Sequence, residues 1–200
     1  MRTSAMATLS VVFGFVPFLF GGIPAAFLAV YLILRWRDLE NPVRDPQLGA
    51  KSVLLFFRQL AVLVALSGAT VILTYLFESW AGRHPNVDTL WTGLALVISN
   101  ALVWFAAGRA LARTNESAFP RATRMFLGFT AVLSGILAIT ALSAGTVALF
   151  TGESGSEATL SWAVTVIWLP ATALLVGAVL QRSPVRAGED FPRPEVGPGA

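Results

Sequence analysis

Residues 60–77 read LAVLVALSGATVILTYLF and contain no charged side chain. About 20 apolar residues in a helix cross the roughly 30 Å hydrocarbon layer of a bilayer. With its flanks, this stretch predicts a membrane-spanning helix over 53–77, and similar apolar stretches lie at 9–34, 89–111, 125–150 and 160–180. Such runs are too long for strands and lack the alternation of a membrane barrel. The sequence therefore predicts an all-α, polytopic transmembrane bundle of five helices.

The composition excludes several classes of protein and site. Charged residues make up 12% of the chain, against about 25% in soluble domains. Cysteine is absent, so disulfides, iron–sulfur clusters and thiolate zinc sites are excluded. The sequence pI is about 10.2, but the arginines are scattered over several loops. The composition therefore favours a lipid bilayer as partner and argues against nucleic-acid binding.

The basic residues predict the orientation of the bundle. They gather in three segments, 35–58, 109–124 and 182–193, whereas the loops at the other side of a five-helix bundle hold only Arg83. Cytoplasmic loops carry the excess of Lys and Arg, so the N-terminus is expected outside and the C-terminus in the cytoplasm. Thirteen arginines against one lysine, with abundant Ala, Gly and Val, favour a bacterial inner membrane. The interfacial tryptophan anchors are then Trp36, Trp80, Trp91 and Trp162.

The first apolar stretch contains residues that interrupt helices. Proline removes a backbone donor and adjacent glycines weaken a helix, which makes a hinge possible at Pro17, Gly21, Gly22 and Pro24. We prefer a kinked span packed through small residues. A discontinuous helix with exposed backbone groups is one alternative, and a re-entrant hairpin that breaks at Gly21 and leaves the N-terminus inside is another. A cleaved signal peptide is disfavoured, because its apolar core has about 7–15 residues.

Two similar segments suggest an internal repeat. Residues 64–68 read VALSG and residues 131–135 read AVLSG, and Ile72 then matches Ile139 as Trp91 matches Trp162. Two hairpins in one orientation would be related by an axis along the membrane normal; chance similarity between apolar helices is the alternative. The predicted organisation is a leading helix (1–34), a cytoplasmic loop (35–52), a hairpin (53–111), a loop (112–124), a second hairpin (125–182) and a disordered tail (183–200).

The paired hairpins, each with arginine on the cytoplasmic side and a Trp- or Gly-rich outer turn, resemble a bacterial family of polytopic membrane proteins. That family is known only as a domain of unknown function, and the resemblance covers about residues 53–182. It implies a tandem two-helix repeat in the cytoplasmic membrane. It implies no activity and transfers no functional residue.

A few polar residues fall inside the predicted spans. They could line a small intramembrane polar site, although a packing role is the simpler interpretation of each: Asn100, Ser134, Thr140 and Pro170. Arg58 is expected to extend its guanidinium to the cytoplasmic headgroups. The outer loop from Glu78 to Asp88, which holds Arg83 and His84, is expected to be solvated rather than a site.

The predicted function is a non-enzymatic structural, accessory or sensory membrane component. No acidic, lysine or histidine side chain lies at the centre of a predicted span, and His84 is the only histidine. We therefore expect neither an enzyme nor a cofactor or metal site. Small-residue pairs that allow close helix approach favour self-association or contact with other membrane proteins; they are Gly108 with Ala112 and Ala141 with Gly145. A small transporter or channel for a neutral or apolar solute is the alternative.

Overall fold

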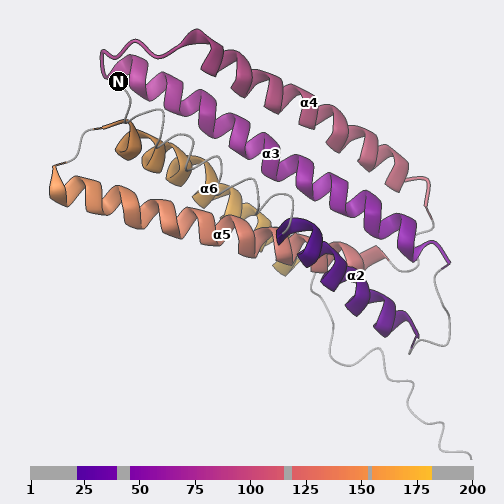
Figure 1. The fold of residues 1–200 in the computed structure, drawn as a ribbon. Coiled ribbons are helices and arrows are strands. Elements are labelled where there is room, and N and C mark those ends of the chain that lie inside the picture. The colour runs from indigo at the N-terminus through magenta and orange to yellow at the C-terminus, as the bar shows by residue number, and fades with distance from the viewer. Residues whose placement is uncertain (1–21, 40–45, 115–118, 153–154, 182–200) are drawn as a thin grey trace, which may run out of the picture.

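The computed structural model of the chain describes residues 22–39, 46–114, 119–152 and 155–181. Helices are the only regular secondary structure in this part, which confirms the predicted fold class (Figure 1). Its elements, in chain order, are α2 (Ile23–Leu39), α3 (Leu48–Trp80), α4 (Val87–Leu111), α5 (Phe119–Thr151) and α6 (Ser156–Gln181).

The four long helices form two hairpins, and α3 of the first hairpin is the central helix of the bundle. α3 packs along α4, and α5 packs along α6, while α3 also contacts both α5 and α6. In Figure 1, α3 consequently lies between α4 on one side and the α5–α6 pair on the other. The helix α4 packs mainly on α3, so it is the peripheral member of the bundle.

All four long helices are long and apolar enough to cross a membrane. At 1.5 Å per residue, the 33 residues of α3 extend about 50 Å, well beyond the roughly 30 Å of hydrocarbon. The helices also extend into the predicted loops 35–52 and 112–124. The helix α2 continues to Leu39, α3 begins at Leu48 and α5 begins at Phe119, so the connections between helices are shorter than predicted. Apolarity marked only the lipid-embedded part of each helix, and packing against neighbouring helices keeps the flanking turns helical.

The leading apolar stretch is described only over its second half, α2. Residues 9–21, which include Pro17 and Gly21 of the predicted hinge, lie outside the described residues, as does the predicted disordered tail. Gly22 directly precedes α2 and Pro24 is its second residue. Gly22 and Pro24 therefore lie at the edge of the described residues, and the rest of the predicted hinge falls outside them.

α2 is held to the bundle by an apolar cluster at the ends of α3, α4 and α5. The Phe27 ring lies 4.3 Å from the Phe56 ring and 5.9 Å from the Phe126 ring, measured between centroids. Such separations are typical of favourable aromatic pairs. The buried residues of the cluster are Val30, Leu34, Leu48, Leu55, Leu111, Ala122 and Phe126.

Both hairpins turn at a glycine with left-handed backbone. Gly82, just after α3, has φ +72°, and Gly152, just after α5, has φ +70°. Glycine adopts this conformation without the steric penalty of a β-carbon, which is why it commonly ends helices. The two turns therefore end their helices by the same local chemistry.

Candidate functional site

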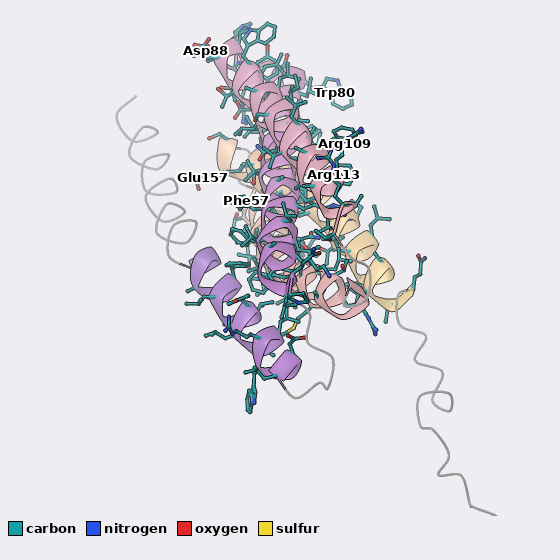
Figure 2. All side chains as sticks on the ribbon, turned by 90° about the vertical axis from the view of Figure 1, so that its right-hand side faces the viewer. Phe57, Trp80, Asp88, Arg109, Arg113 and Glu157 are labelled. Carbon is teal, nitrogen blue, oxygen red and sulfur yellow. The ribbon has the colours of Figure 1, made fainter. Side chains whose placement is uncertain are left out.

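The two ends of the bundle differ in charge. The starts of α3 and α5 and the end of α4 form one end, which we call the basic end. The opposite end, which holds Glu78, Asp88 and Glu157, we call the acidic end. In Figure 2, Asp88 lies at the top of the α3–α4 hairpin, and Arg109 and Arg113 lie below it in the view. The basic end carries Arg35, Lys51, Arg58, Arg109, Arg113 and Arg124.

Hydrogen bonds between side chains join α6 to both α3 and α5. The Trp168 indole Nε1–H donates to Thr70 Oγ1 at 3.0 Å, and Thr70 in turn donates to the Leu66 carbonyl of its own helix at 2.9 Å. One α-helical turn along α6, the Thr172 hydroxyl shares its single proton between Ser134 Oγ at 2.9 Å and the Trp168 carbonyl of its own helix at 2.7 Å. Trp168 and Ser134 are buried. These polar atoms consequently link the three helices α3, α5 and α6.

The residues predicted to line a polar site lie in different surroundings. Asn100, on the peripheral α4, donates its side-chain amide to the Leu96 carbonyl of the same helix at 2.8 Å. Ser134 is fully buried between α5 and α6. Thr140 and Pro170 are exposed on the outside of α5 and α6. No hydrogen bond joins these four residues in the described structure, and only Ser134 takes part in an interhelical one.

Sequence reasoning missed Thr70 and Trp168. A usable signal was present, because Trp168 lies near the middle of its span rather than at an interface, where tryptophans are usually found. A buried indole N–H usually has a hydrogen-bond acceptor. A threonine at similar depth on another helix was therefore a reasonable candidate partner.

Buried polar oxygens also occur near the basic end. Ser52 Oγ and Gln59 Oε1 on α3, and Thr123 Oγ1 on α5, are buried without a hydrogen-bond partner among the described residues. Lys51, beside Ser52, is buried as well. An unsatisfied buried polar group costs about 1–3 kcal/mol, so this end of the bundle gives up some stability at these positions.

A cleft opens on the surface of the basic end between α3 and α4. The Arg58 guanidinium lies over the Trp104 ring, with its Cζ 4.8 Å from the ring centroid. The cleft has a volume of about 330 Å³ and is lined by Arg58, Trp104, Phe105, Gly108 and Arg109. A β-carbon built at Gly108 meets no atom within 4 Å. This glycine therefore faces open space, with no other helix of the described chain against it.

A second, open groove of about 560 Å³ lies at the acidic end. The Arg83 guanidinium donates to Thr159 Oγ1 at 3.4 Å and thereby ties the α3–α4 turn to the start of α6. The remaining lining is largely apolar, with Phe77, Trp162 and Val166. Within the described ranges, no group of three or more His, Asp or Glu side chains is placed to hold a metal ion.

The small-residue pair on α5 does lie in a helix interface. Ala141 and Gly145 are buried, and a β-carbon at Gly145 would lie 3.1 Å from the Trp162 ring. Trp162, near the start of α6, therefore packs on α5.

No protein-family model, curated protein or solved structure matches the chain.

Proposed function

We propose that the chain is a non-enzymatic structural or accessory component of a bacterial inner membrane, with its basic end in the cytoplasm. The observation that carries this proposal is the pair of interhelical bonds, Trp168 to Thr70 and Thr172 to Ser134. Polar atoms within a membrane protein often mark a substrate or ion path. Here they bond one another across helices, which suits a scaffold.

The peripheral helix α4 is the proposed contact with other membrane proteins or with a second copy. It has few buried residues, and its exposed side chains include Ile98, Leu102 and Phe105. Helices associate in lipid through close packing rather than through hydrophobic exclusion from water. A helix packed mainly on one neighbour retains the surface that such packing needs.

Single-cysteine cross-linking tests this proposal directly, because the chain has no cysteine of its own. Leu102→Cys on α4 is expected to give cross-linked products in native membranes. Leu174→Cys on α6 is the matched control, since it is an equally apolar and exposed position. Equal products from the two variants, or a clean monomer in several mild detergents, would contradict the role of α4.

The alternative function, passage of a neutral or apolar solute, depends on a path through the predicted polar residues. Thr140 and Pro170 are exposed on the outside of the bundle rather than along a path between its helices. The transport function therefore has less support than the scaffold function. Asn100→Leu decides between them: a transporter should lose uptake while keeping its membrane level, whereas a scaffold should be unaffected.

A further inference from the structure

The cleft at the basic end combines two arginines, an aromatic wall and an open floor. Arg58 comes from α3, and Trp104, Phe105, Gly108 and Arg109 come from the last turns of α4. Trp104 and Gly108 are four residues apart, so they lie on one face of the helix. Phe105 and Arg109 have the same spacing on the adjacent stripe. The absent side chain of Gly108 leaves open space in the lining of the cleft.

The depth of this cleft matches that of lipid headgroups. If Trp80 marks the acidic-end interface, about 20 residues of hydrocarbon-spanning helix place the other boundary near Arg58. On α4, the same reasoning from the exposed Trp91 reaches Arg109. The two guanidiniums therefore stand at the level of the phosphates of the leaflet at the basic end.

The chemistry of the cleft suits a phosphodiester attached to acyl chains. Guanidinium groups bind phosphate oxygens through paired N–H donors, and basic pockets between transmembrane helices bind anionic headgroups. The stacking of Arg58 on Trp104 holds one guanidinium in place. Towards the membrane centre, the exposed surfaces of Phe105, Leu102 and Ile98 provide an apolar track along α4.

We propose that this cleft is a binding site for one anionic phospholipid, whose phosphate lies between Arg58 and Arg109. This goes beyond the scaffold function. It assigns the stretch of α4 beside the cleft to a lipid, so a protein partner would contact α4 outside that stretch. It also differs from the general tendency of interfacial arginines to reach headgroups, because a defined cleft predicts that only the arginines lining it matter.

Native mass spectrometry of the detergent-solubilised chain tests the site. The protein is titrated with phosphatidylglycerol or with phosphatidylcholine of the same acyl chains. One phosphatidylglycerol per chain is expected to bind about tenfold more tightly than phosphatidylcholine. Arg58→Gln and Arg109→Gln should each reduce this preference about fivefold. Equal retention of the two lipids by the unaltered chain would overturn the proposal.

Two controls separate a site from diffuse charge. Arg113→Gln removes an equal charge from the same end at an exposed position outside the cleft, and it should leave the preference unchanged. Gly108→Leu fills the cleft without altering charge, in a place with open space, and should abolish the preference without lowering the unfolding midpoint, because leucine favours a helix more than glycine does. Equal losses in Arg113→Gln and Arg58→Gln would exclude a defined site.

A third arm distinguishes a lipid from a soluble ligand. Inorganic phosphate at millimolar concentration should not displace the bound phosphatidylglycerol, because it lacks the acyl chains that contact α4. Displacement by inorganic phosphate alone would overturn the lipid assignment and identify a soluble phosphate as the ligand.

Discussion

Gly68 on α3 and Gly93 on α4 meet backbone to backbone. A β-carbon at Gly68 would lie 2.8 Å from the Gly93 carbonyl oxygen, and one at Gly93 would lie 2.9 Å from the Gly68 carbonyl oxygen. Real β-carbons do not approach backbone atoms so closely, so neither position accepts a side chain without separating the helices. At this reciprocal contact the backbones of the peripheral helix α4 and the central helix α3 approach each other closely.

Gly68→Ala and Gly93→Ala should therefore each destabilise the bundle by about 1–3 kcal/mol, the usual cost of overpacking. The measurement is unfolding in mixed micelles of mild detergent and dodecyl sulfate. Gly128→Ala and Gly177→Ala are the matched controls, because a β-carbon at either position meets nothing within 4 Å. The α3–α4 contact would be misassigned if all four variants behaved alike.

The Trp168–Thr70 hydrogen bond should give a measurable coupling energy. Trp168→Phe removes the indole donor and Thr70→Val removes the acceptor oxygen that lies 3.0 Å away. A double-mutant cycle of these changes should give about 0.6 kcal/mol, the average found for hydrogen bonds within membranes, and at most about 1.7 kcal/mol. The same cycle with Thr74→Val should give a coupling near zero, because the Thr74 hydroxyl bonds the Thr70 carbonyl of its own helix.

Replacing either of two fully buried serines by alanine should change the stability of the bundle, in opposite directions. Ser52 Oγ has no hydrogen-bond partner among the described residues, so Ser52→Ala should stabilise the bundle by about 1 kcal/mol. Ser134 Oγ accepts from Thr172 and donates to the Ala131 carbonyl, so Ser134→Ala should destabilise it by about 1 kcal/mol. Thermal unfolding of both variants in one detergent checks the pair. A loss of stability in Ser52→Ala would indicate that its hydroxyl is satisfied.

Cysteine accessibility should reveal the orientation of the bundle. In spheroplasts, a membrane-impermeant maleimide should label His84→Cys, at the acidic end, without permeabilisation. Arg113→Cys, at the basic end, should react only after the membrane is opened. Both positions are exposed in the structure, so burial cannot explain a difference between them. The reverse pattern would invert the predicted topology.

A reporter fused before Met1 would show on which side of the membrane the N-terminus lies. If residues 9–34 form one kinked span, the reporter should lie outside. A cytoplasmic reporter would instead support a re-entrant hairpin that breaks near Gly21 and Gly22.

The sequence alone was sufficient to predict the helical membrane bundle, because lipid demands about 20 apolar residues per span and this demand is local. The glycines after α3 and α5 were visible in the same way. The centres of the four described spans were therefore predictable, whereas their ends were not. The helical turns near Leu48 and Phe119 are stabilised by packing against α2 and against each other. The length of an apolar stretch in the sequence gives no information about such contacts.

Only the tertiary structure decided which residues meet. Gly68 and Gly93, Thr70 and Trp168, and Arg58 and Trp104 each come from different helices, and the rotation of each helix about its axis determines their contact. Apolarity all round a helix leaves that rotation undetermined, because lipid and a neighbouring helix are equally apolar surroundings. The sequence by itself therefore determined that these helices lie in a membrane, and packing decided which faces they turn towards one another.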